Sequence, residues 1–177
     1  MKGLIQIYCG EGKGKTTAAI GQAVRSAGCG LSVVFVRFLK TDCSGELTSL
    51  ERIPGIRLIP CERNFGFFWN MTEEEKKEAA SVYQAMLEQA ERAAVRSAET
   101  KDTVLVMDEI IATYGHGLVD REKFLEFLKN RPENLEVVMT GRDPAPELTE
   151  LADYVSEIRK VKHPFDRGIH ARKGIEF

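Results

Sequence analysis

The chain carries a glycine-rich loop close to its start, Cys9–Thr17, with the sequence CGEGKGKTT. The loop follows the apolar run Leu4–Tyr8 and leads into the helix-forming residues Ala18–Gly21. Glycines at alternate positions let the backbone adopt conformations closed to other residues and turn its N–H groups inward, which produces a concave anion site at a helix N-terminus. The order of strand, loop and helix therefore predicts a phosphate-binding loop.

The loop fits the phosphate-loop pattern G-x-x-x-x-G-K-[ST] at every position except the first, where Cys9 stands in place of glycine. Lys15 supplies a charge for phosphate oxygens, and Thr16 supplies a hydroxyl where nucleotide-bound Mg²⁺ expects one. The alternative is a glycine-rich turn with a chance lysine. Because the strand before it and the helix after it are the context that the motif requires, we expect a nucleoside triphosphate to bind here.

Length and charge narrow the classes of protein further. A chain of 177 residues suits one domain with a substantial core, with residues 159–177 expected as a C-terminal tail. No apolar run approaches the ~20 residues of a membrane helix, and the N-terminus shows no secretory signal. The formal net charge of −2 gives no overall attraction to nucleic acid or anionic lipid. We therefore expect a cytoplasmic protein with neither nucleic acid nor membrane as a partner.

Apolar strands alternate with helical segments through the chain. Val33–Val36 are consecutive apolar residues, which is typical of a parallel strand buried on both faces. Pro60 limits the strand over 56–60 to an end or an edge, and Thr72 with Glu75 forms a capping box for a helix running to about residue 98. The alternation predicts an α/β fold of the P-loop NTPase type, with a mostly parallel sheet of about five or six strands flanked by helices.

Three segments at predicted strand ends are candidates for chemistry. The polar segment Lys40–Glu46 leaves the carboxyl end of a strand, where open α/β sheets place their ligands. Asp108 and Glu109 end another strand and either hold Mg²⁺ or complement a helix dipole; the phosphate loop in the same chain favours the metal, with Thr16 as a further ligand. Arg142 follows a third strand, within reach of phosphate.

Four aromatic residues gather in Phe65–Trp69, including the only tryptophan. Two interpretations stay open: a plug whose rings pack into the core, or a wall for a flat, apolar ligand.

The basic C-terminal tail also has two interpretations, since it is either a solvated end or a segment whose residues 163–166 fold back over the site.

Taken together, these motifs resemble the cobalamin adenosyltransferases of the corrinoid-specific P-loop family, which make the adenosyl form of vitamin B12. The members of that family also lack glycine before the loop, which accounts for Cys9, and the resemblance spans essentially the whole chain. Some relatives carry an additional N-terminal segment that helps to cover the site. The motifs that carry the resemblance are Gly10–Ala19, Phe67–Trp69, Asp108–Glu109, Thr140–Arg142, Leu151–Glu157, Val161–Gly168 and Gly174–Phe177.

The resemblance implies that Co(I) of a reduced corrinoid attacks the ribose 5′ carbon of ATP, so that the 5′-deoxyadenosyl group is transferred and tripolyphosphate leaves. It further implies Mg²⁺, a reversed orientation of ATP in the loop, a separate flavoprotein reductant and a homodimer. The aromatic residues are thought to displace the lower axial ligand of cobalt, which makes Co(I) attainable.

The implied roles can be assigned residue by residue. Catalysis falls to Lys15, Phe67, Trp69 and Glu109; ATP binding to Gly10, Glu11, Gly12, Lys13, Gly14, Lys15, Thr16, Thr17 and Arg142; corrinoid binding to Phe67, Phe68 and Trp69; and metal binding to Thr16, Asp108 and Glu109.

Three other classes also use a phosphate loop: a DNA-stimulated motor ATPase, a small-molecule kinase and a nucleotide-binding regulatory module. The net charge and the lack of a concentrated basic loop count against the motor ATPase. The products distinguish the other two, because a kinase yields ADP and a regulatory module yields no product.

Overall fold

A computed structural model describes residues 1–40, 45–61, 63, 65–66 and 68–176 of the chain. The strands are β1 (Ile5–Cys9), β2 (Ser32–Arg37), β3 (Ile56–Ile59), β4 (Thr103–Asp108), β5 (Leu135–Thr140) and β6 (Tyr154–Glu157). The α-helices are α1 (Lys15–Gly28), α2 (Gly45–Leu50), α3 (Glu73–Ala98), α4 (Ile110–Gly115), α5 (Arg121–Asn130) and α6 (Pro146–Leu151), and two 3₁₀ turns are η1 (Phe68–Asn70) and η2 (Pro164–Arg167).

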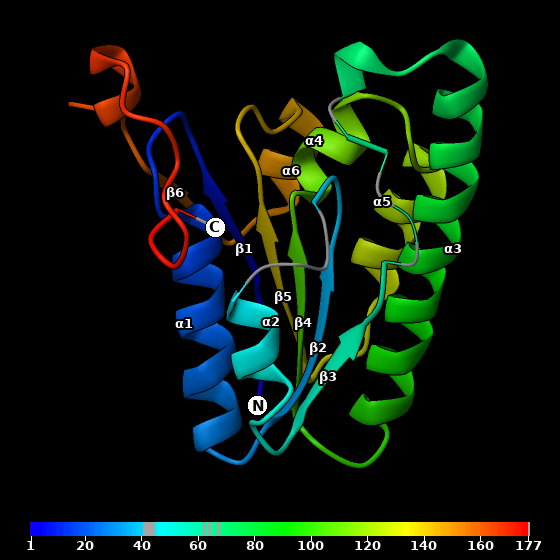
Figure 1. Cartoon of the computed structure of the whole chain (residues 1–177). Coiled ribbons are helices and arrows are strands. Elements are labelled where there is room, and N and C mark those ends of the chain that lie inside the picture. Colours follow the sequence, from blue (N-terminus) through cyan, green and yellow to red (C-terminus); the bar gives the residue numbers. More distant parts are fainter. Residues whose placement is uncertain (41–44, 62, 64, 67, 177) are drawn as a thin grey trace.

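The six strands form a sheet in the order β3-β2-β4-β5-β1-β6, and every neighbouring pair is parallel (Figure 1). The predicted α/β fold with a parallel sheet of five or six strands is therefore confirmed. β3 lies at one edge, as the proline after it predicts. No helix among the described residues is long and apolar enough to cross a membrane.

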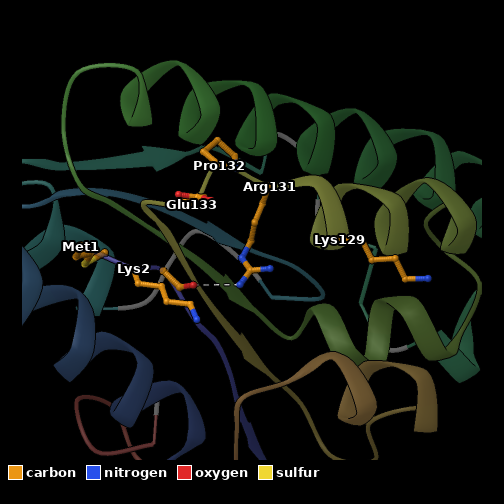
Figure 2. Close-up of a pocket in the computed structure, with 7 residues that line it drawn as sticks. Met1, Lys2, Lys129, Arg131, Pro132 and Glu133 are labelled. Atoms are coloured by element: carbon orange, nitrogen blue, oxygen red, sulfur yellow. Dashed lines mark hydrogen bonds between the residues drawn. The ribbon is translucent and has the colours of Figure 1, made fainter.

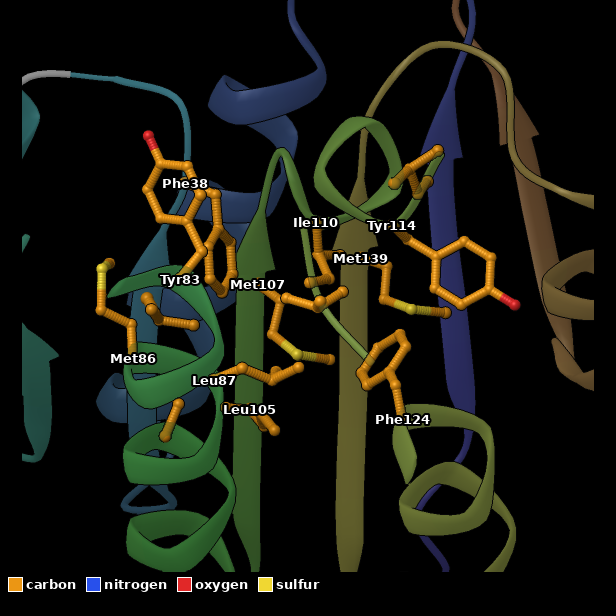
Figure 3. Packing of buried hydrophobic residues seen from close by; sticks show 14 of the residues in the cluster. Phe38, Tyr83, Met86, Leu87, Leu105, Met107, Ile110, Tyr114, Phe124 and Met139 are labelled. Atoms are coloured by element: carbon orange, nitrogen blue, oxygen red, sulfur yellow. The ribbon is translucent and has the colours of Figure 1, made fainter. Parts of the chain in front are cut away.

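Alternation along the strands divides the core into two layers. On β4, Val104 and Val106 pack with residues of α1 and α2, whereas Leu105 and Met107 pack on the opposite face with α3 (Figure 3). Figure 1 shows α1 and α2 on one side of the sheet and α3 and α5 on the other. Helices on both faces leave the carboxyl ends of the strands as the open rim of the sheet.

The capping box predicted for the long helix is present at the start of α3. The Glu75 backbone N–H donates to Thr72 Oγ1 (3.2 Å), and the Thr72 N–H donates to Glu75 Oε2 (2.8 Å).

Sequence patterns did not indicate α4, because its N-cap residue Glu109 makes no side-chain cap bond and has a φ of 63°. α4 carries one wall of the candidate site described below.

Burial of a glutamate in α3 provides a test of the packing on this side of the sheet. Burial, and secondarily the Glu88 carboxylate, raises the pKa of Glu91 from 4.5 to about 7, and Glu91 Oε1 is buried with no hydrogen-bond partner among the described residues. Since the folded protein holds this proton more tightly than the unfolded chain, Glu91 costs stability progressively as the pH rises from 4.5 to about 7.

We expect Glu91→Gln to raise the free energy of unfolding at pH 8 by roughly 1–3 kcal/mol, because glutamine carries no charge to desolvate. The gain should shrink towards pH 4.5, where the glutamate is itself neutral. Urea unfolding at both pH values measures it, with Glu126→Gln, an exposed glutamate of α5, as the matched control. A gain of equal size at both pH values would contradict this explanation.

Candidate active site

The phosphate loop joins β1 to α1 and requires glycine at three positions. Gly10 and Gly14 have φ angles of +100° and +116°, which residues with side chains rarely adopt. At Gly12 a Cβ atom would lie 2.6 Å from the carbonyl oxygen of Ile158, to which the Gly12 N–H donates a hydrogen bond (2.7 Å). The segment after β6 therefore fixes the shape of the loop from outside.

Lys15 places its ammonium group against the inside of the loop. Its Nζ donates to the carbonyl oxygens of Gly10 (2.7 Å) and Gly12 (2.8 Å), and burial lowers its pKa. Gly14 caps α1 without a side chain, so no side-chain oxygen competes for the first N–H groups of the helix. The loop thus combines a partly desolvated cation with a helix N-terminus, an arrangement that favours an anion.

A hydrogen-bonded network connects this loop to the ends of β4 and β5. Asp108 is fully buried, and its Oδ1 accepts hydrogen bonds from Thr16 Oγ1 (2.8 Å) and Thr140 Oγ1 (2.7 Å). Thr140 Oγ1 in turn accepts from the backbone N–H of Glu109 (2.9 Å). The three predicted metal ligands, Thr16, Asp108 and Glu109, therefore lie together at the rim of the sheet.

Lys40 lies among these same oxygens. Its Nζ donates to Thr16 Oγ1 (2.7 Å) and Asp108 Oδ2 (2.8 Å), and lies 3.6 Å from Glu109 Oε1. The sequence predicted substrate contact for the segment that Lys40 begins, but not this position next to the carboxylates. The next residues of that segment, 41–44, lie outside the described residues.

The donor set fits a nucleotide-bound Mg²⁺. One hydroxyl and two carboxylates supply the hard oxygen ligands that Mg²⁺ prefers, and phosphate and water complete its shell in nucleotide sites. Within the described ranges, no three His, Cys, Asp or Glu side chains gather into a metal cluster of their own. Glu109 occupies the N-cap position of α4, and its side chain makes no hydrogen bond to the first N–H groups of that helix.

A cavity of about 600 Å³ opens beside this network. It is lined by charged groups on one side and by aromatic and small apolar residues on the other. Its lining consists of Leu39, Lys40, Gly66, Phe68, Trp69, Glu109, Ile111, Ala112, Gly115, His116, Arg142 and Asp143.

The aromatic segment divides between the two interpretations given to it. Phe65 packs against the core, with its ring edge-on to Tyr83 at 5.7 Å between centroids. Phe68 both packs against the core and lines the cavity, whereas Trp69 lines the cavity and is 75% exposed. Phe67, to which the resemblance assigns catalysis and corrinoid binding, lies outside the described residues.

His116 is a cavity residue that sequence reasoning missed. Its ring stacks on Phe68 with centroids 4.0 Å apart and an interplanar angle of 5°, and Trp69 meets it edge-on at 6.1 Å. Burial lowers the pKa of His116, which favours the neutral imidazole in this stack. No sequence pattern indicated it, because it directly follows the unpredicted helix α4.

Arg142 lines the cavity next to the phosphate loop. Its carbonyl oxygen accepts from the Gly10 N–H (2.9 Å), and its guanidinium pairs with the Glu11 carboxylate. Lys13 and Thr17 are exposed, and no residue of the phosphate loop from Gly10 to Thr17 lines this cavity. Residues 163–166 of the tail do not line it either, and Phe165 is 70% exposed, as expected for a solvated end.

A second cavity, of about 540 Å³, lies at the opposite end of the sheet (Figure 2). It adjoins the amino ends of β1 and β5, where Arg131 donates to the carbonyl oxygens of Leu128 (2.8 Å) and Gly3 (3.2 Å). Parallel sheets bind ligands at the carboxyl ends of their strands, so we assign the site to the first cavity.

The parallel sheet, the glycine-rich loop and the carboxylates at the neighbouring strand end define a P-loop nucleotide-binding protein. The whole chain, residues 1–177, matches the family described as "ATP:corrinoid adenosyltransferase BtuR/CobO/CobP". The chain belongs to this family, whose enzymes transfer an adenosyl group from ATP to a corrinoid.

Three relatives are each named a corrinoid adenosyltransferase. The proteins of Escherichia coli K12 and Salmonella typhimurium are both 35% identical to this chain, covering 99% of it and 86% of their own length. The Pseudomonas aeruginosa protein is 33% identical over 99% of this chain and 84% of its own. Among solved structures, ATPases 2 and 3 of EssC from Geobacillus thermodenitrificans align with a TM-score of 0.49 at 13% identity, over 98% of this chain and 36% of that one.

Proposed function

We propose that this enzyme transfers the 5′-deoxyadenosyl group of ATP to the Co(I) centre of a corrinoid substrate, releasing tripolyphosphate and forming adenosylcobalamin or an adenosylated precursor. Adenosyl transfer from ATP to a corrinoid is the reaction of its family. One observation carries the assignment to this site. Three residues that contact the phosphate-loop network also line the cavity walled by Phe68 and Trp69; they are Lys40, Glu109 and Arg142. Such a junction suits a reaction between a polyphosphate ester and an apolar macrocycle.

The phosphate loop would bind the leaving tripolyphosphate. The N–H groups of Gly10–Gly14 and the α1 N-terminus offer fixed dipoles, and Lys15 would exchange its two carbonyl partners for phosphate oxygens. Lys13 and Arg142 add charge from the surface, while Glu11 orients the Arg142 guanidinium. Negative charge builds up on the leaving group in this reaction, so catalysis here is electrostatic and needs no general base.

Thr16, Asp108 and Glu109 would hold Mg²⁺, with Thr17 beside them, and the ion would neutralise charge on the polyphosphate. Asp108 is well placed because two threonine hydroxyls orient the same carboxylate oxygen.

The aromatic wall would receive the corrinoid. The exposed Trp69 ring and the Phe68 ring stacked on His116 offer apolar surface beside the nucleotide site, and Phe67 joins them by the family resemblance. Packed against the lower face of the macrocycle, these rings would exclude water and the fifth ligand from cobalt, which makes reduction to Co(I) attainable.

We further propose a separate flavoprotein reductant, a homodimer, a cytoplasmic location, and a single domain with residues 159–177 as its tail.

Analysis of the phosphate products tests this function against its rivals. We expect anaerobic reaction of Mg-ATP with a Co(I) corrinoid to release tripolyphosphate in amounts equal to the corrinoid consumed, as followed by ³¹P NMR. ADP formed with a phosphorylated product would indicate a kinase, and DNA-stimulated formation of ADP and phosphate would indicate a motor ATPase. Absence of any product would leave a nucleotide-binding module.

A further inference from the structure

The ammonium group of Lys40 lies where the three proposed metal ligands converge. It is 2.7 Å from Thr16 Oγ1, 2.8 Å from Asp108 Oδ2 and 3.6 Å from Glu109 Oε1. The Asp108 side chain is fully buried, whereas that of Lys40 is 32% exposed and reaches inward from the cavity. A buried carboxylate is costly without a partner, so this lysine stabilises the network by charge pairing.

A metal ion and this ammonium group cannot share these oxygens. Mg²⁺ binds its ligands at about 2.1 Å, so an ion held by Thr16 and Asp108 would lie in direct contact with the nitrogen that both residues now bind. Two cations at that separation repel strongly in a partly buried site. Binding of the metal therefore requires that Lys40 leave.

We propose that Lys40 is a built-in cation that occupies the metal position until Mg-ATP arrives, and that it then moves to contact the polyphosphate. The exchange makes metal binding depend on nucleotide, because free Mg²⁺ must displace Lys40 without compensation, whereas Mg-ATP offers the displaced ammonium new phosphate partners. This inference rests on the proposed function in taking Thr16, Asp108 and Glu109 as the metal ligands.

The backbone around Lys40 is arranged for such a movement. Among the described residues, Leu39 (φ 56°) and Glu109 (φ 63°) are the non-glycine residues with positive φ, and both adjoin this cluster. The left-handed region is strained for a leucine, because its Cβ crowds the backbone. The strain at Leu39 accompanies the inward position of Lys40, so its relaxation would offset part of the cost of releasing the ammonium group.

The displaced side chain would stay close to the nucleotide. On one side of Lys40, the Phe38 N–H donates to the carbonyl oxygen of Asp108 (3.0 Å). Arg37, which also precedes Lys40, pairs through its guanidinium with Glu46 in the first turn of α2 (3.0 Å). The backbone before Lys40 is thus anchored, and the Lys40 side chain already lines the cavity together with Arg142.

Binding of Mn²⁺, measured by electron paramagnetic resonance, tests the exchange without turnover. In the absence of nucleotide, we expect Lys40→Met to bind Mn²⁺ roughly tenfold more tightly than the parent protein, because the competing charge is gone. Added tripolyphosphate should raise the Mn²⁺ affinity of the parent protein more than that of the variant. Lys101→Met, which removes an exposed lysine at the opposite end of β4, should match the parent in both conditions.

Equal affinity of Lys40→Met and the parent for free Mn²⁺ would overturn the proposal, as would an equal gain for Lys101→Met. Lys40→Gln serves as a second variant if the methionine protein fails to fold, since its amide can still bond to the carboxylates. If the parent protein releases tripolyphosphate but Lys40→Met binds free Mn²⁺ no more tightly than the parent, the role of Lys40 is rejected and the proposed function stands. If Lys40→Met binds Mn²⁺ more tightly but the parent protein does not adenosylate the corrinoid, the exchange is retained and the proposed function is rejected.

Discussion

Replacement of Lys15 by alanine is expected to reduce kcat/KM for adenosyl transfer roughly 10²–10³-fold while the protein stays folded. Lys15 is the partly buried cation of the loop and contacts two of its carbonyl oxygens, so its removal takes away charge-assisted contact with the leaving polyphosphate. Steady-state kinetics with Co(I) corrinoid measure the loss, and circular dichroism checks the fold.

Lys13→Ala is the matched control for this loop, because the Lys13 side chain is exposed. We expect a smaller loss for it than for Lys15→Ala. Near-full activity of Lys15→Ala, or a greater loss at Lys13, would contradict the role given to the loop.

Trp69→Ala should impair the use of Co(II) corrinoid with an enzymatic reductant at least tenfold more than the use of chemically reduced Co(I). The exposed Trp69 ring is assigned to displacing the lower ligand of cobalt, a step that pre-reduced substrate bypasses. Burial of one large aromatic side chain contributes about 1.5–3 kcal/mol, which corresponds to tenfold or more. Parallel assays with the two substrates measure the ratio.

Phe65→Leu provides the comparison within the same segment, because Phe65 packs against Tyr83 in the core and does not line the cavity. Any loss it causes should be the same for both corrinoid states. Equal losses with both substrates for Trp69→Ala would reject the displacement role.

The sequence predicted the fold well because its signals are local. Continuous apolar runs marked the buried parallel strands, and the capping box at Thr72 and Glu75 marked the start of α3. α4 escaped prediction because Glu109 enters it through a left-handed backbone conformation, without a side-chain cap.

The candidate site was predictable only in part. Thr16 and Asp108 stand in recognisable motifs, so their pairing could be expected. Lys40 joins them because β2 lies directly beside β4 in the sheet, and the order of strands in a parallel sheet is not encoded in any local pattern. His116 was missed for a similar reason, since its stacking on Phe68 is a contact between segments distant in sequence.

Formation of a cobalt–carbon bond tests the central claim most directly. The protein is incubated anaerobically with Mg-ATP and a Co(I) corrinoid, and the visible spectrum is followed in the dark and then under light. We predict that the Co(I) spectrum gives way to that of a light-sensitive adenosyl product, and that this change is lost in Lys15→Ala. Persistence of Co(I) while ATP is converted to ADP would contradict the account.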